Sequence, residues 1–179
     1  MTDPSAGLVF PDRKRHGAYD VTDSTGVVAR IAVSWTGNRF TATDAQGAPL
    51  CAAWTSWWRL PTRWEATGPH GSPLLTARMR GITKTRAEVH LHRGGRFLVQ
   101  GSAWRRDFRV TDEHGEVVLT AAPRSSALSL RPHDYAVQQA PGTLQLPEVV
   151  ALVQIWRMTT KEESATAAGG AVAGGAAVG

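Results

Sequence analysis

The chain of 179 residues has the length of one typical domain, and its 42% hydrophobic residues can build one sizeable core. The charged fraction of 20% excludes a fully disordered chain, and a single cysteine excludes an internal disulfide framework. The formal net charge of +5 is the one compositional indication of a partner, and it is ambiguous about which kind.

The N-terminal residues lack the basic and apolar regions of a secretory signal. Residues 1–15, which include Arg13, Lys14 and Arg15, are expected to form a flexible basic arm. No run of about 18 apolar residues occurs, so no transmembrane span is predicted. Together with the single cysteine, these features favour a cytoplasmic location.

A weak internal repeat is the most informative feature of the sequence. An aromatic residue is followed by Thr at three places, Asp or Gly at four and Gly at seven, in residues 19–26, 40–47, 64–71 and 108–115. The aromatic residue and the residue two places later face one side of a strand, Asp closes a turn, and Gly supplies a positive φ. An apolar run follows each copy, so the repeat predicts β-hairpins.

The segments between the copies also have strand patterns. Residues 86–92 alternate apolar and polar positions, 93–96 form a turn, and 97–100 return as the next strand. Short strands at 128–130 and 135–139 bring the count to ten to twelve. We therefore predict a mainly β fold, a closed antiparallel barrel of about twelve strands.

Tryptophan clusters after the second copy of the repeat. Trp54 is expected in the core, on one strand face with Leu50 and Ala52. Trp57 and Trp58 point to opposite sides if the strand continues, which makes one of them a candidate interface aromatic beside basic residues. The alternative is an aromatic side chain that covers the end of the barrel.

Basic residues concentrate in one stretch of the chain. Residues 78–109 contain nine basic and two acidic side chains, a balance of +7, while the rest of the chain carries −2. Such a zone can attract phosphates of lipids, nucleotides or nucleic acid; the alternative is a solvated outer face of two or three strands. The candidate ligand-binding residues are Arg78, Arg80, Lys84, Arg86, Arg93, Arg96, Arg105 and Arg106.

No catalytic residue, metal site or cofactor is predicted. His90 and His92 share a face of one expected strand, but no third metal ligand accompanies them, and two solvated side chains are the simpler interpretation. The aspartates of the repeat, Asp23, Asp44 and Asp112, are explained as turn residues. Cys51 lies in an apolar strand, where a buried, inert thiol is expected.

A helix is predicted at about 147–158, because Pro147 suits a helix start and Glu148 suits the first turn. Its apolar positions cover most of the circumference, and a barrel lumen is the natural surrounding for such a helix. These core positions are Val149, Val150, Leu152, Val153, Ile155 and Trp156. Residues 161–179, rich in Ala and Gly, are expected to form a disordered tail.

A series of hairpins followed by one buried apolar helix resembles the Tubby C-terminal-like superfamily, in particular the LURP-one-related proteins and the phospholipid scramblase relatives. The resemblance is carried by residues 40–47, the Phe-x-Val-x-Asp-x-x-Gly pattern within 97–115, residues 134–137 and residues 146–156. It implies a twelve-stranded barrel closed around a central helix, over residues 16–160. Tubby proteins bind phosphoinositide headgroups and scramblase relatives act at membranes, whereas many bacterial LURP-one-like members have no assigned activity.

We therefore expect a non-enzymatic binding module for anionic lipid headgroups or another anionic ligand, cytoplasmic or peripheral at a membrane. A structural or protein-interaction module without a small ligand is the alternative, and an enzyme with an unrecognised site is the third reading. Nucleic acid is a less favoured partner, because no RNA-recognition or zinc-finger signature accompanies the arginines and tryptophans.

Overall fold

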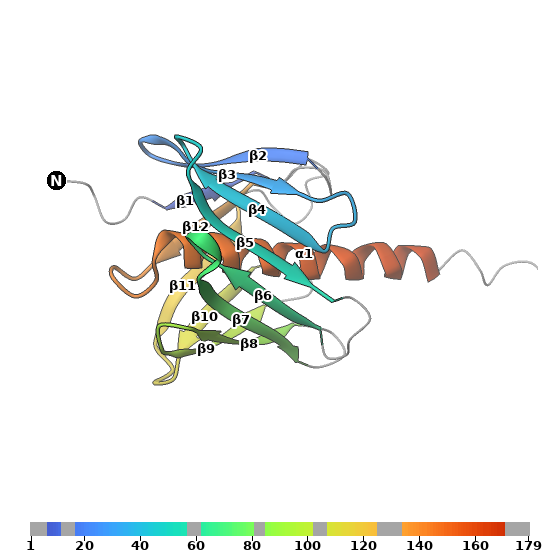
Figure 1. Ribbon diagram of the computed structural model, residues 1–179. Helices are drawn as coiled ribbons and strands as arrows, with labels where there is room; N and C mark the ends of the chain where they lie inside the picture. Colours follow the sequence, from blue (N-terminus) through green and yellow to red (C-terminus); the bar gives the residue numbers. More distant parts are fainter. Residues whose placement is uncertain are drawn as a thin grey trace, which may run out of the picture.

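Twelve antiparallel strands form a closed barrel around one long helix in the computed structural model (Figure 1), which describes residues 7–11, 17–56, 62–80, 85–101, 107–124 and 134–170. Strands consecutive in the sequence are neighbours, and β1 closes the barrel between β12 and β2. This confirms the predicted fold class. The elements are β1 Leu8–Phe10, β2 Gly17–Asp23, β3 Gly26–Val33, β4 Arg39–Asp44, β5 Pro49–Thr55, β6 Arg63–Thr67, the 3-10 turn Pro69–Gly71, β7 Pro73–Arg80, β8 Arg86–Leu91, β9 Arg96–Gly101, β10 Phe108–Asp112, β11 Val117–Pro123, β12 Tyr135–Gln139 and α1 Leu146–Gly170.

Each copy of the repeat is one hairpin, as predicted. The carboxylate of Asp44 accepts hydrogen bonds from the backbone N–H groups of Gln46 and Ala48 at 2.9 and 2.8 Å. The carboxylate of Asp112 accepts the corresponding hydrogen bonds in its own turn, from the second and fourth residues after it. The carboxylate of Asp23 accepts hydrogen bonds from the backbone N–H groups of Thr25 and Gly26. The hydrogen bonds from Thr25, its side chain first, lower the pKa of Asp23. These carboxylates therefore stabilise the hairpin turns.

The hairpin repeat gives the barrel two different ends. Turns after β2, β4, β6, β8 and β10 all lie at the end where α1 begins, which we call the turn end. The helix runs through the barrel and leaves at the opposite end, the helix-exit end, where β5, β7 and β9 finish and the β3–β4 turn lies (Figure 1).

The helix fills the lumen. All residues from 148 to 159 are buried, including the six predicted core positions, so the expected central helix is confirmed. It is longer than expected, because α1 continues to Gly170 through a segment assigned to a tail. Alanine has the highest helix propensity, and a helix that has already nucleated propagates easily. Among the described residues, no helix is long and apolar enough to cross a membrane.

The structure corrects the expected N-terminal arm over residues 1–15. Leu8–Phe10 form strand β1, which pairs with β12 and β2, and Phe10 is fully buried. Buried Arg157 of α1 holds the end of this strand: its Nη2 donates to the carbonyl of Pro11 at 2.6 Å, and its guanidinium lies 5.8 Å from the centroid of the Phe10 ring. The arm therefore excludes these three residues.

The expectation that Trp54 lies in the core is wrong. Strand β5 turns Cys51 and Ala53 inward, and Trp54 faces outward, 38% exposed. The physical reason is the helix, which leaves room for small side chains on the inner faces of the strands. Buried alanines on these faces are Ala29, Ala42, Ala53, Ala66, Ala77, Ala87 and Ala121.

Candidate anion-binding face

Arginines of four strands, β6, β7, β8 and β10, gather on the outer surface of the barrel, in the half toward the helix-exit end. We call this set the basic face; it consists of Arg63, Arg78, Arg80, Arg86 and Arg109. Strand alternation places them there, because Ala77, Met79 and Ala87 occupy the inward positions between them. All five arginines are exposed.

Two pairs of arginines are direct neighbours across strands. Arg63 of β6 lies opposite Arg78 of β7, and Arg80 of β7 lies opposite Arg86 of β8. Like charges at directly opposed positions destabilise a sheet, so this arrangement is not what strand pairing by itself favours.

Carboxylates compensate only part of this charge. Arg80 Nη2 lies 2.7 Å from Glu88 Oε2, a hydrogen bond that lowers the pKa of Glu88, and Arg63 pairs with Glu65 at 3.2 Å. Within the described part of the chain, Arg78 and Arg86 make no hydrogen bond or ion pair. The basic face therefore keeps a surplus of positive charge that an anionic group can neutralise.

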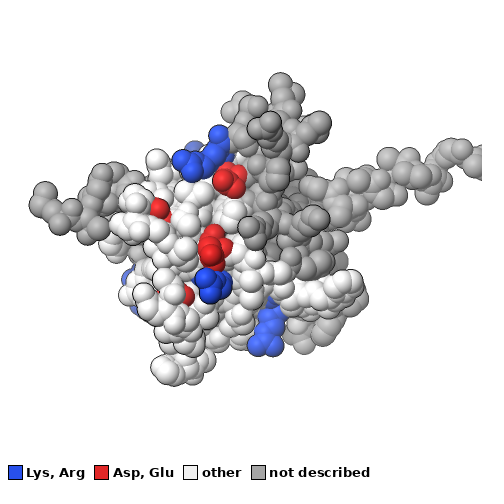
Figure 2. Space-filling view, turned by 90° about the horizontal axis from the view of Figure 1, so that it is seen from above, with Lys and Arg blue, Asp and Glu red and all other residues white. Residues whose placement is uncertain are grey.

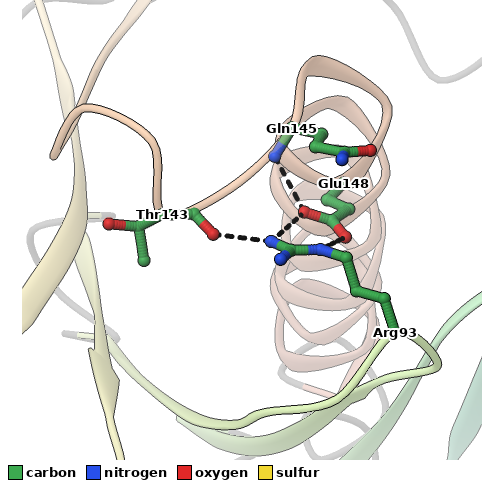
Figure 3. A network of polar contacts seen from close by, with 4 residues as sticks. All are labelled: Arg93, Thr143, Gln145 and Glu148. Atoms are coloured by element: carbon green, nitrogen blue, oxygen red, sulfur yellow. Dashed lines mark hydrogen bonds and ion pairs between the residues drawn. The ribbon is translucent and has the colours of Figure 1, made fainter.

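Arg93, a predicted binding residue, is engaged with the helix (Figure 3). Its Nε and Nη2 donate to the two carboxylate oxygens of Glu148 at 2.6 and 3.0 Å, and Nη2 also donates to the Thr143 carbonyl. Glu148 is 1% exposed and accepts a further bond from the N–H of Gln145, as in a capping box. The hydrogen bonds to Glu148 raise the pKa of Arg93. This network ties the β8–β9 turn to the start of α1.

Arg96 lies apart from the basic face, at the turn end of β9. It borders an open groove of about 530 Å³ on the outside of β8 and β9, a volume typical of small-molecule sites. The groove is lined by both signs of charge, including Arg80, Arg96, Glu88, Asp112 and Glu113. The carboxylates disfavour a purely anionic occupant. The remaining predicted residues, Lys84, Arg105, Arg106, Trp57 and Trp58, lie outside the described residues.

The face formed by β2 and β3 carries balanced charge. Figure 2 looks down on the face at the top of Figure 1, where β2 and β3 lie, and basic and acidic side chains are beside one another on it. Arg30 Nε, for example, lies 2.8 Å from Asp20 Oδ1. The surplus on the basic face is therefore a local property.

The candidate metal ligands of the sequence do not form a metal site in the described part of the chain. His90 and His92 are both exposed, and the described residues contain no group of three or more His, Cys, Asp or Glu that could hold a metal ion. Burial raises the pKa of the Cys51 thiol to about 12, which keeps it protonated and unreactive.

Three exposed residues of this region were not among the predicted site residues. Arg63 and Arg109 join the basic face only through strand pairing, which local sequence does not specify. Trp35 is 81% exposed in the β3–β4 turn. The Gly37 two residues later, with φ of 71°, was the available signal that this tryptophan lies in a turn.

Comparison with known proteins agrees with this architecture. The sequence profile of the family described as LURP-one-related matches residues 12–156. A crystal structure of a protein from Arabidopsis thaliana has the same fold, with a TM-score of 0.63 and 20% sequence identity over 86% of this chain and 91% of that chain. A search of curated proteins found no match.

Proposed function

The chain belongs to the LURP-one-related family of Tubby-like barrels, and on that premise we propose that it is a non-enzymatic module that binds anionic lipid headgroups through the basic face. One observation carries the proposal: two pairs of arginines face each other across strands, and among the described residues Arg86 has no ion pair, while Arg78 shares Glu88, which lies opposite it and whose pKa it helps to lower, with Arg80. A bound phosphate between such neighbours would replace repulsion by two charge-assisted contacts.

The direct test is co-sedimentation with vesicles at low salt. Vesicles of phosphatidylcholine alone are compared with vesicles of phosphatidylcholine and phosphatidylglycerol. We expect the protein to sediment only with the anionic vesicles, since each basic side chain near such a surface contributes about 1 kcal/mol. Equal sedimentation with both vesicle types, or with neither, would contradict the proposal.

A single substitution separates a binding surface from a solvated strand face. Arg86→Thr removes one charge of the Arg80–Arg86 pair and introduces a residue with high strand propensity. We expect weaker sedimentation with anionic vesicles together with an unchanged or higher melting temperature. Arg30→Thr on β3, where Asp20 is the partner, is the matched control and should sediment like the wild type. If both variants lose binding equally, net charge alone explains the interaction.

A further inference from the structure

The closing strand β1 lies between the last strand, β12, and β2, and we call these three strands the seam. We propose that the barrel opens locally at the seam and that Arg157 of α1 sets how often it opens. This inference goes beyond the proposed function and does not depend on whether the basic face binds lipid.

The seam has the shortest strand pairing of the barrel. Strand β1 contains only the residues Leu8–Phe10, and its pairing with β2 consists of the single register pair Val9–Thr22. Strand β2, by contrast, pairs with β3 along its whole length. Because β1 separates β2 from β12, loss of β1 alone would open the closed sheet. Segments with few backbone bonds and little buried surface open at a lower free energy than the rest of a fold.

The guanidinium group of Arg157 contacts all three strands of the seam from inside the lumen. Its Cζ atom lies 5.8, 5.3 and 5.4 Å from the ring centroids of Phe10 in β1, Tyr19 in β2 and Tyr135 in β12. A cation within about 6 Å of a ring centroid is attracted to the face of the ring, and the attraction is stronger when the pair is removed from water. Arg157 is buried, so the three rings hold it in a desolvated position.

Hydrogen bonds connect the same guanidinium to β2 and to the end of β1. Arg157 Nη2 donates to the Pro11 carbonyl at 2.6 Å, and Nη1 donates to the Tyr19 hydroxyl at 3.3 Å. The Tyr19 hydroxyl in turn donates to Oε1 of Gln154, one turn earlier on α1. Hydrogen bonds from a charged donor are stronger than those between neutral groups. One side chain of the helix therefore holds the first two strands and the last strand together.

The helix has a second polar connection to the barrel, which provides a comparison. The ion pair of Arg93 with Glu148 joins the β8–β9 turn to the start of α1, and Arg93 also donates to the Thr143 carbonyl. None of these residues belongs to the seam. Both connections use a guanidinium that donates to a backbone carbonyl, so a change at Arg93 is a matched control for a change at Arg157.

Hydrogen–deuterium exchange of the full-length protein, followed by mass spectrometry, measures the opening of each strand. Strands β6 and β7, which lie across the barrel from the seam, are the reference. We expect peptides that cover β1 and β12 to exchange faster than those that cover β6 and β7, because opening of the seam does not require unfolding of the other strands. Exchange of all four strands at one common rate would show that the barrel opens only as a whole and would overturn the inference.

Arg157→Lys tests the part played by the guanidinium. Lysine keeps the positive charge but lacks the planar fork that stacks on rings and donates in two directions. We expect β1 and β12 to exchange about tenfold faster than in the wild type, with β6 and β7 unchanged. The control Arg93→Lys should speed exchange at the β8–β9 turn and at the start of α1 and leave β1 and β12 unchanged.

Phe10→Leu is a milder second variant, because it keeps an apolar side chain in the core and removes only the ring. We expect a smaller acceleration, confined to the same two strands, and this variant decides the question if Arg157→Lys does not fold. Exchange of β1 and β12 at the wild-type rate in both variants would contradict the role of Arg157. Equal acceleration of all strands would also contradict it, since that result indicates a general loss of stability.

Discussion

Small residues decide how closely the helix can approach the wall of the barrel. Gly101 ends β9 beside Trp156, and the Trp156 ring also lies 5.3 Å from the Phe108 ring between centroids. A Cβ atom at position 101 would lie 2.3 Å from Cζ2 of Trp156 and 3.1 Å from the Asp107 carbonyl oxygen. The glycine therefore provides the space that the largest side chain of the helix occupies.

We expect Gly101→Ala to lower the free energy of unfolding by about 1–3 kcal/mol, the usual cost of overpacking. Gly68→Ala is the matched control, because the nearest atom to its Cβ would be Ser72 Oγ at 3.1 Å, its other contacts would be at 3.8 Å or more, and the φ of Gly68 suits any residue. Urea unfolding measures both. A Gly101→Ala protein as stable as the wild type would mean that Trp156 does not pack against β9.

Burial of the Cys51 thiol makes the stability of the fold depend on pH in the alkaline range. Burial raises the pKa of its thiol to about 12, whereas the thiol of the unfolded chain ionises at about 8.5. The unfolded state therefore loses its proton first, so this contribution to stability is complete below about pH 8.5 and is lost as pH rises toward 12.

The measurement is urea unfolding of the wild type and Cys51→Ala between about pH 7 and pH 10. The wild type should lose stability more steeply, by up to about 1.4 kcal/mol per pH unit. Parallel curves would show that the thiol is accessible to solvent.

At the scale of elements, the hairpins could be predicted from local sequence, because each depends on an Asp and a Gly within one turn. Which side chains of β5 point into the barrel could not be predicted. Trp54 points outward because the lumen is occupied by a helix that comes about one hundred residues later in the chain. The roles of Glu148 and Arg157 could not be predicted either, because their partners, Arg93 and Pro11, are 55 and 146 residues away in the sequence. Strand β1 could not be predicted, because its short apolar segment becomes a strand only by pairing with β12 and β2 when the barrel closes.

The helix is the core of the barrel, so a charge inside it should be severely destabilising. Val153 is fully buried, and Val153→Asp should cost about 3 kcal/mol or more because the charged carboxylate is taken out of water into the packed lumen. Val117→Asp, at an exposed position of β11, should melt close to the wild-type temperature. A Val153→Asp protein with an unchanged melting temperature would show that the helix does not lie in the lumen.

At the scale of the whole molecule, turn chemistry and charge are linked. Hairpins closed by Asp make the turn end acidic, and the arginines of the described residues lie mainly in the other half of the barrel. The sequence predicts the density of arginine in residues 78–109, since that is a local count. It does not predict that Arg93 pairs with Glu148, which depends on the position of the helix, or that Arg63 joins the basic face, which depends on strand register.

The central claim is that the surplus positive charge of the basic face binds an anionic surface. The most direct measurement is the salt dependence of binding to phosphatidylglycerol-containing vesicles for the wild type, Arg78→Gln and the control Arg30→Gln. Binding of the wild type and Arg30→Gln should fall steeply as the Debye length shortens from about 10 Å to about 3 Å, and Arg78→Gln should bind more weakly with a shallower slope. Binding that is independent of salt, or an Arg78→Gln curve identical to that of the wild type, would contradict the claim.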